Sequence, residues 1–403
     1  MRSLPTNFKH DLLLVACSCI ATLAFSASSP AQDIKINKWL PDSMQVHGFL
    51  SQGFIHTSDN NFFGHSNDSL STDFRELGIN GSWRALPDLQ LAMQVVWHDA
   101  GQTDEDGLRI DYGLANYNFF STESSLLAIR AGRILTPLGF YNETRDVAAT
   151  RPSILLPQSI YFDRNRNLAL SADGGYLYGE HRTEFGDFSF NFGLVIPRTD
   201  DPEFVNTILR GETGNLKGDT SWVARLGYEA PDSGVRLAVT YAEFLSDFHS
   251  SKQPLNEGSF HFSPLILSAQ YNAEKWSLTA EYALRRTRLD YFKLPDIGFT
   301  GQSYYIQGAY RFTDKLEGLV RYDELVQDLN DQYGYRYPTR LGPSFSRYAR
   351  DWTFGLRYEI LPSLLMSAEY HHINGTGWLS RLENTQNETQ HWDMYTFMLS
   401  YNF

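Results

Sequence analysis

The residues best placed to do chemistry lie between Ile134 and Leu170, in a segment with no regular hydrophobic period. Charged side chains that line a narrow passage decide which ions and polar solutes enter it. The alternative is that these side chains pair with one another and pin the segment to its surroundings. No Ser/His/Asp grouping or Gly-rich nucleotide fingerprint is recognisable in the sequence. The candidate constriction residues, whose charges sum to +1, are Tyr141, Glu143, Arg145, Asp146, Arg151, Tyr161, Asp163, Arg164 and Arg166.

The chain on both sides of this segment alternates apolar and polar residues, as strands with two different faces do. The last such stretch carries Tyr395, Phe397, Leu399, Tyr401 and Phe403 on one face. Every second connection is a tight turn, and the intervening ones run from about eight to about thirty-seven residues, which is typical of outer-membrane barrels. We predict sixteen strands, with 14 or 18 as alternatives, near residues 46–56, 72–83, 88–99, 108–118, 125–133, 171–182, 187–196, 220–229, 234–244, 260–272, 275–285, 303–312, 316–325, 350–360, 364–372 and 393–403.

The polar face of these strands carries many charges, and this separates a membrane barrel from a soluble β-sandwich. A water-filled interior solvates such charges, whereas a dry core would impose several kcal/mol for each unpaired ion. We therefore expect an all-β, transmembrane, antiparallel up-and-down barrel, with the long loop after the fifth strand folded inward. On each strand, the residues that alternate with the apolar ones should face the interior. The residues predicted in this way for the inner wall are Glu76, Arg109, Asp111, Arg130, Arg225, Arg236, Glu281, Arg285, Arg321, Asp323, Arg357 and Glu369.

The first 31 residues have the features of an export signal, with a basic start, an apolar stretch from Leu12 to Phe25 and small residues before Gln32. Cleavage there would remove both cysteines; lipidation at Cys17 is the alternative. Residues 32–45 then form a short periplasmic lead-in, and residues 46–403 form the barrel. The net charge of −13 becomes −14 after cleavage and offers no basic surface for nucleic acid.

Two further groups of residues have more than one interpretation. An acidic loop could bind calcium through its carboxylates, but a solvated acidic loop explains it as well. A tyrosine-rich loop could stack sugars at the mouth or serve only to pack neighbouring loops. The acidic loop contains Asp99, Asp104, Glu105 and Asp106. The tyrosine-rich loop contains Tyr333, Tyr335, Tyr337, Arg336 and Arg340.

Across its mature length the chain resembles the Gram-negative porins. The resemblance rests on the rhythm of short turns and long loops, on the long fifth loop and on the ending Leu399, Tyr401 and Phe403. In that family such an ending is the signal read by the barrel-assembly machinery, and the long loop narrows the channel. The family's acidic Pro-Glu-Phe-Gly motif is absent, its nearest counterpart being Pro137-Leu138-Gly139-Phe140, and this departure leaves the family's usual pore charge pattern unproven for this chain.

This resemblance implies a homotrimer in the bacterial outer membrane, in contact with lipid and lipopolysaccharide. We expect a water-filled channel for passive diffusion of small hydrophilic solutes, without cofactor or metal and without enzymatic activity. Arginines on the wall and the slightly positive loop favour a weak preference for anions. The alternatives are a channel specific for small organic or hydrophobic compounds and a barrel hydrolase.

Overall fold

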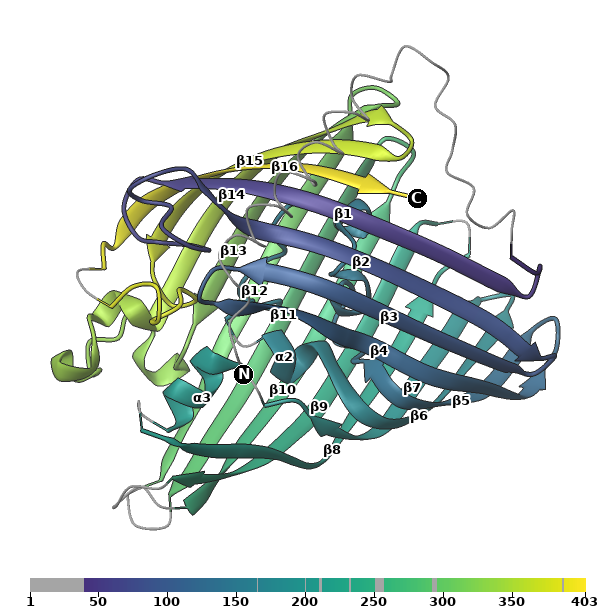
Figure 1. Ribbon diagram of the computed structural model, residues 1–403, viewed down its shortest axis with the longest axis horizontal. Helices are drawn as coiled ribbons and strands as arrows, with labels where there is room; N and C mark the ends of the chain where they lie inside the picture. Colours follow the sequence, from purple (N-terminus) through teal and green to yellow (C-terminus); the bar gives the residue numbers. More distant parts are fainter. Residues whose placement is uncertain are drawn as a thin grey trace.

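The computed structural model describes residues 40–403, except 165, 200, 210–211, 232, 251–256, 292–295 and 386–387. The predicted export signal, residues 1–31, and the lead-in up to residue 39 lie outside the described residues. Most of the described residues lie in one antiparallel sheet (Figure 1). The strands are β1 (Met44–Thr57), β2 (Ser71–Leu86), β3 (Leu89–Ala100), β4 (Asp104–Ser121), β5 (Ser125–Leu135), β6 (Ser171–Thr183), β7 (Gly186–Pro197), β8 (Gly214–Glu229), β9 (Val235–Ser250), β10 (Glu257–Asn272), β11 (Trp276–Tyr291), β12 (Ile297–Arg311), β13 (Leu316–Val326), β14 (Tyr348–Leu361), β15 (Leu364–Gly375) and β16 (His391–Asn402).

The strands form one closed barrel in which each strand pairs with its neighbours in sequence, and β1 also pairs with β16. The closing register brings Phe49 opposite Asn402, and Gly48 and Phe403 exchange two backbone hydrogen bonds of 3.0 Å. Closure matters because an open sheet edge in lipid would leave backbone groups without partners. The prediction of a sixteen-stranded antiparallel barrel is confirmed.

The two faces of each strand differ sharply in exposure. On β13, Val320 is 45% exposed and its neighbour Arg321 is only 1% exposed. The same alternation puts exposed Leu, Ile and Phe side chains on the outer face and most charged side chains on the inner face of the strands. Exposed Trp276 and Tyr310 stand opposite each other at the short-turn end of β11 and β12. The outer face thus has an apolar band with aromatic side chains at its border, as a lipid-facing surface requires.

The strands near the long connections are longer than the sequence predicted. β8 begins at Gly214 instead of near residue 220, and β11 continues to Tyr291 instead of ending near 285. β4 begins at Asp104, so only residues 101–103 connect it to β3. The prediction that every intervening connection has about eight residues or more is therefore wrong. Backbone pairing continues into polar sequence, where the hydrophobic alternation that we used to detect strands has ended.

The helices of the described residues are all short. They are η3 (Asn142–Thr144), η4 (Ala148–Thr150), α2 (Arg166–Leu170), α3 (Pro202–Ile208), η5 (Leu329–Asp331), η6 (Thr339–Leu341) and η7 (Ser344–Arg347). None has the length and apolar character needed to cross a bilayer as a helix. We call the end of the barrel with the long connections its outer end, and the opposite end, which carries the short turns, its turn end.

Candidate functional site

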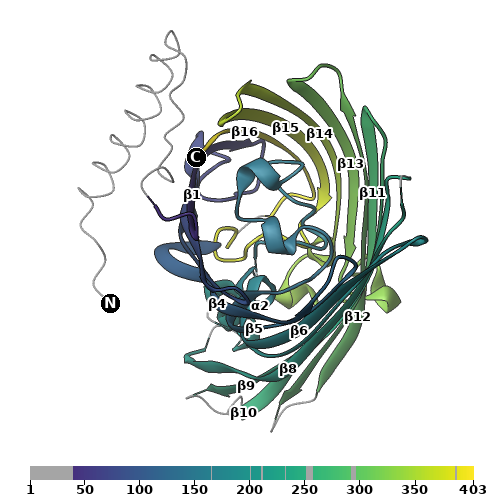
Figure 2. The same ribbon diagram turned by 90° about the vertical axis from the view of Figure 1, so that its right-hand side faces the viewer.

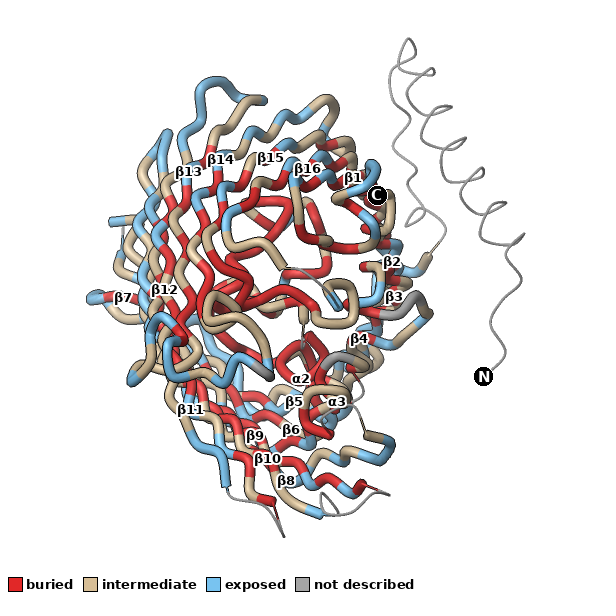
Figure 3. The backbone as a smooth tube through the Cα atoms, turned by 90° about the vertical axis from the view of Figure 1, so that its left-hand side faces the viewer, coloured by how far each residue is buried: buried red, intermediate tan, exposed pale blue. Residues whose placement is uncertain are grey.

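The segment from Thr136 to Leu170, here called the inner segment, connects β5 to β6 and contains η3, η4 and α2. Figure 2, which looks into the barrel, shows these short helices within the ring of strands. Most of its residues are buried, as the red tube inside the barrel in Figure 3 indicates. Its hydrogen bonds reach inner-face side chains on β2, β8, β11, β13, β14 and β15. The wall therefore holds the segment from several directions.

Glu281 on β11 anchors the beginning of the inner segment. Its carboxylate accepts hydrogen bonds from the backbone N–H of Phe140 at 3.0 Å and from the hydroxyl of Tyr161 at 2.5 Å. Two further hydroxyls, from Tyr305 and Ser268, complete its contacts. Four donors can satisfy a carboxylate that is 2% exposed, where an unpaired charge would be costly.

Gly139 explains the local sequence beside this anchor. Its φ of +60° is a left-handed conformation that residues with a Cβ rarely adopt. A Cβ at this position would overlap the hydroxyl of Tyr161 and lie 2.7 Å from a carboxylate oxygen of Glu281. The glycine in Pro137-Leu138-Gly139-Phe140 is thus required by the close approach of backbone and carboxylate.

The middle of the segment is fixed by β13 and β15. The backbone N–H groups of Ile154 and Leu155 donate to the carboxylate of Glu369, the second at 3.3 Å. Arg321 donates to the hydroxyl of Ser153 at 2.9 Å and to the carbonyl of Leu155 at 3.1 Å. These charged wall residues therefore bind backbone and hydroxyl groups of the inner segment instead of facing open water.

Arg151 makes the most geometrically complete ion pair of the site. Both of its terminal nitrogens donate to the carboxylate of Glu76 on β2 at 2.7 Å, and both side chains are at most 4% exposed. Arg357 on β14 donates to the carbonyls of Arg151 and Ala149 at 2.6 and 2.7 Å. A bidentate ion pair of this kind fixes the relative orientation of the two side chains as well as the distance between them.

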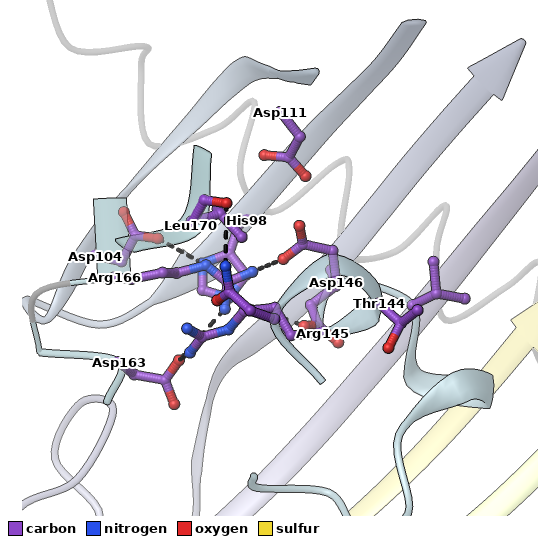
Figure 4. A network of polar contacts seen from close by, with 12 residues as sticks. His98, Asp104, Asp111, Thr144, Arg145, Asp146, Asp163, Arg166 and Leu170 are labelled. Carbon is purple, nitrogen blue, oxygen red and sulfur yellow. Dashed lines mark hydrogen bonds and ion pairs between the residues drawn. The ribbon is translucent and has the colours of Figure 1, made fainter. Parts of the chain in front are cut away.

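A buried ionic network joins the end of the inner segment to β3 and β4 (Figure 4). Within the segment, Arg145 pairs with Asp163 at 2.6 Å, and Arg166 pairs with Asp146 and, at 3.3 Å, with Asp163. Burial lowers the pKa of Arg166 to about 9, and the positive charges of Arg145 and Arg109 add to this effect. On the wall, the network continues through the pairs His98–Asp104, Arg109–Asp104 and Arg109–Asp111.

One face of the inner segment remains open to water. Thr144 is exposed, Tyr141 is half-buried, and the side chain of Glu143 is 35% exposed while it accepts a hydrogen bond from Arg225 at 3.1 Å. The guanidinium of Arg236 lies 4.7 Å over the ring of Phe140. The open face thus combines one carboxylate with two partly exposed arginines of β8 and β9.

The structure divides the predicted site residues into two groups. Asp111 and most of the charged residues we singled out are buried in the contacts above. Partly exposed members are Tyr141, Glu143 and Arg164 in the inner segment and Arg109, Arg130, Arg225, Arg236 and Arg357 on the wall; buried members are Arg145, Asp146, Arg151, Tyr161, Asp163, Arg166, Asp111, Glu281, Arg285, Arg321, Asp323 and Glu369. The alternative of internal pairing therefore describes the contacts of the buried group.

Sequence reasoning missed a contact between loops at the outer end. Glu383, in the connection before β16, accepts backbone N–H groups from Phe63, Gly64 and Gln102 at 2.9 to 3.0 Å. In the same connection, Trp378 belongs to the same apolar cluster as Ile154 of the inner segment. No sequence signal links residues so far apart, since Glu383 and Phe63 are separated by 320 positions.

The acidic loop considered as a calcium site is occupied by ion pairs where it is described. Asp99 lies 2.8 Å from Arg75, and Asp104 pairs with His98 and Arg109. The side chains of Glu105 and Asp106 lie outside the described residues. Among the described side chains, no cluster of three or more metal-ligating residues is found.

The family model of Gram-negative porins matches residues 16–403, so the chain belongs to this family. It is an outer-membrane channel for small solutes, and this membership points to a channel and not to an enzyme. Comparison with curated protein sequences gave no match.

Solved structures of outer-membrane proteins have the same fold at low identity. The channel DcaP of Acinetobacter baumannii has a TM-score of 0.58 at 10% identity, with 89% of this chain and 97% of that chain covered. An anion-selective porin from Comamonas acidovorans has a TM-score of 0.57 at 11% identity, with 90% of this chain and 99% of that chain covered. In-vitro folded OmpT of Vibrio cholerae has a TM-score of 0.55 at 12% identity, with 93% of this chain and 100% of that chain covered. These likenesses establish the barrel architecture.

Proposed function

We propose that solutes cross this barrel by passive diffusion and that the inner segment forms the narrowest part of their path. The observation that carries this proposal is the attachment of the segment to several strands of the inner wall, through side chains such as Glu281, Glu369 and Arg151. A segment held in this way reduces the cross-section without blocking it, provided that one face stays in water. Tyr141, Glu143 and Thr144 form that face.

The open face supports a weak preference for anions. Arg225 and Arg236 lie beside it, and Arg130, whose guanidinium is 4.2 Å from the ring of Tyr178, is another partly exposed cation of the inner wall. Glu143 is the acid that faces them. Opposite charges across a passage create a transverse field, and the excess of arginine favours negative solutes. One structural neighbour is described as an anion-selective porin, which is consistent with this proposal.

We further propose a homotrimer whose outer faces contact lipid and lipopolysaccharide. A trimer form of OmpT of Vibrio cholerae is among the structural neighbours. The terminal residues Leu399, Tyr401 and Phe403 would be read by the barrel-assembly machinery. In the folded barrel Phe403 closes the seam with β1 through its hydrogen bonds to Gly48.

Planar-bilayer recordings of the purified full chain test the channel proposal. We expect discrete conductance steps and a reversal potential, in a potassium chloride gradient, that shows weak selectivity for chloride. Liposome swelling with neutral sugars of increasing size would then measure the narrowest part. A folded barrel that inserts without conducting, or a clear selectivity for potassium, would contradict the proposal.

A further inference from the structure

The outer face of β5 and β6 presents no aromatic ring. β5 contains no Phe, Tyr or Trp, and the two tyrosines of β6, Tyr176 and Tyr178, lie on the inner side and are at most 9% exposed. On the outer face, Ile129 stands opposite Leu177, and these side chains are 37% and 40% exposed. In the single chain this face is therefore open, apolar and without aromatic side chains.

The wall formed by β12, β13 and β14 has aromatic rings at both borders of the apolar band. Near the outer end, the ring of Tyr322 lies 6.1 Å from that of Tyr304 and 5.0 Å from that of Trp352. At the turn end, the rings of exposed Tyr310 and Phe312 are 5.2 Å apart. Aromatic girdles at both interfaces are typical of a barrel surface that faces lipid. β5 and β6 lack this feature although they belong to the same closed barrel.

An ion pair lies on this face without aromatic rings. Arg133 of β5 donates to both carboxylate oxygens of Asp173 of β6, at 2.7 and 2.9 Å, and the two side chains are 31% and 53% exposed. Arg133 stands opposite Gly113 of β4. Nearer the outer end, β4 still presents the exposed side chains of Ile110 and Leu108. The ion pair therefore lies within the apolar band and not beyond it.

Two other charges of the outer face lie beyond an aromatic side chain. On β13, Glu324 comes after Tyr322 toward the outer end, and on β14 Arg350 has the same position relative to Trp352. These two charges pair at 3.4 Å. No aromatic side chain of β5 or β6 separates their ion pair from the apolar band in this way. Because a charge on the lipid face of a barrel strand is destabilising, and more so with depth, hydrocarbon is an unsuitable neighbour for this pair.

Small side chains lie next to the ion pair on its turn-end side. Ala131 of β5 stands opposite Ala115 of β4 and Gly175 of β6. Ala131 is exposed, and the other two residues are half-buried. Small residues at a membrane-embedded surface let the backbone of a neighbouring protein element approach closely. The polar groups of such a neighbour can hydrogen-bond the exposed part of the ion pair, which hydrocarbon cannot do.

We propose that the outer face of β5 and β6, from Ile129 and Leu177 to the Arg133–Asp173 pair, is a contact surface for a second copy of this chain. A copy inserted in the same orientation carries its apolar band at the same depth, so the two bands meet without mismatch. In a ring of three, each copy presents this face to a different face of its neighbour. The inference deepens the proposed homotrimer and rests on it, because it names the surface that the trimer buries.

Fluorescence quenching by lipids with brominated acyl chains tests whether this face meets hydrocarbon. Both cysteines of the sequence lie in the predicted export signal, so one introduced cysteine can carry the fluorophore. Ala131→Cys labels the proposed surface, and Val320→Cys, at a position that is 45% exposed on the outer face of β13, is the matched control. We expect the label at position 320 to lose fluorescence in brominated phosphatidylcholine and the label at position 131 to keep it. Equal loss at both positions would overturn the proposal.

Sedimentation of the detergent-solubilised full chain gives a second measurement. Ala131→Trp places a large side chain on the flat surface and should dissociate the oligomer, whereas Val320→Trp should leave its mass unchanged. Since Ala131 faces away from the pore, the conductance of each Ala131→Trp barrel should equal that of a barrel of the unchanged chain. Equal conductance shows that the variant folds.

The outcomes separate this inference from the proposals on which it rests. An oligomeric chain whose mass is unaffected by Ala131→Trp would overturn the surface and leave the homotrimer standing. A monomeric unchanged chain would refute the homotrimer and the surface together, while its conductance would still decide the channel proposal. If Ala131→Trp does not fold, Asp173→Asn takes its place. It should shift the oligomer toward monomers, and the control Glu324→Gln should not; equal masses for these two variants would overturn the surface.

Discussion

The two faces of the inner segment carry the same kinds of charged residue in very different surroundings. On the buried face Arg151 pairs with Glu76 at 2.7 Å, with both side chains out of water. On the open face Glu143 contacts Arg225 at 3.1 Å while keeping 35% of its side chain exposed. An ion pair in the first environment is costly to break, whereas one in the second is screened by water and salt. Burial thus separates residues that hold the segment from residues that can act on a passing ion.

The largest effect is expected from Arg151→Ala on the buried face. It leaves Glu76 as an uncompensated buried charge, and removing one partner of such a pair costs about 3–5 kcal/mol. Urea unfolding in lipid vesicles should show this loss of stability. The conservative change Arg151→Lys keeps the charge but not the two-pronged geometry, so it should retain part of the stability. A loss below 1 kcal/mol for Arg151→Ala would show that this pair does not hold the segment.

Gly139→Ala should have the next largest effect. The left-handed conformation costs a residue with a Cβ about 1–2 kcal/mol, and the overlap with Tyr161 adds to this. Gly298→Ala is the matched control, since a Cβ at Gly298 would meet nothing within 4 Å. The same unfolding measurement should rank Gly139→Ala well below Gly298→Ala in stability. Equal stability of the two variants would contradict the tight approach at Glu281.

On the open face, single substitutions should change ion selectivity and leave stability within about 1 kcal/mol, as for other exposed pairs. Glu143→Gln should increase the preference for chloride, and Arg236→Gln should decrease it. A unit charge about 7 Å from an ion in water is worth about 0.6 kcal/mol, which is a two- to threefold change in permeability ratio. Reversal potentials in a potassium chloride gradient measure this change in permeability ratio. Shifts in the same direction for both variants would refute the assignment.

The smallest effect concerns the outer loops and depends on pH. Burial raises the pKa of the Glu383 carboxyl above its usual value of 4.5. The hydrogen bonds from Gly64, Gln102 and Phe63 act in the opposite direction and offset only part of this rise. Because the folded loop binds the proton more tightly than the unfolded chain, the stability contributed by this group is lost as pH rises from 4.5 through the raised pKa. Hydrogen exchange of these three amides, corrected for intrinsic rates, should therefore accelerate over that range. Glu383→Gln should abolish this pH dependence; if it persists, another group is responsible.

The sequence predicted the barrel well because the lipid-facing side of a strand must be apolar at every second residue. Segments such as Trp352 to Tyr358 carry that pattern, and their strand, β14, lies where we expected it. Beyond the membrane the pattern ends while pairing continues, so the outer starts of β4 and β8 were misplaced.

The candidate site could be predicted only in part. The charged composition of residues 134–170 indicated a functional loop, and strand parity selected the wall residues. Composition does not tell which charges will be buried, because Arg151 and Arg164 have the same chemistry and differ only in their partners. The partner of Arg151 is Glu76, which is 75 positions away, so the pairing follows from the closed barrel and not from any local pattern.

Cysteine accessibility tests the central claim most directly, namely that one face of the inner segment borders water inside a conducting pore and the other is buried. Both cysteines of the sequence lie in the predicted export signal. Thr144→Cys would place a thiol on the exposed face, and Ser159→Cys would place one at a position that is 0% exposed. We predict that a charged thiol reagent lowers the single-channel conductance of the Thr144 variant in discrete steps and leaves the Ser159 variant unchanged. Equal reaction of both, or an unchanged conductance of the modified Thr144 variant, would contradict the account.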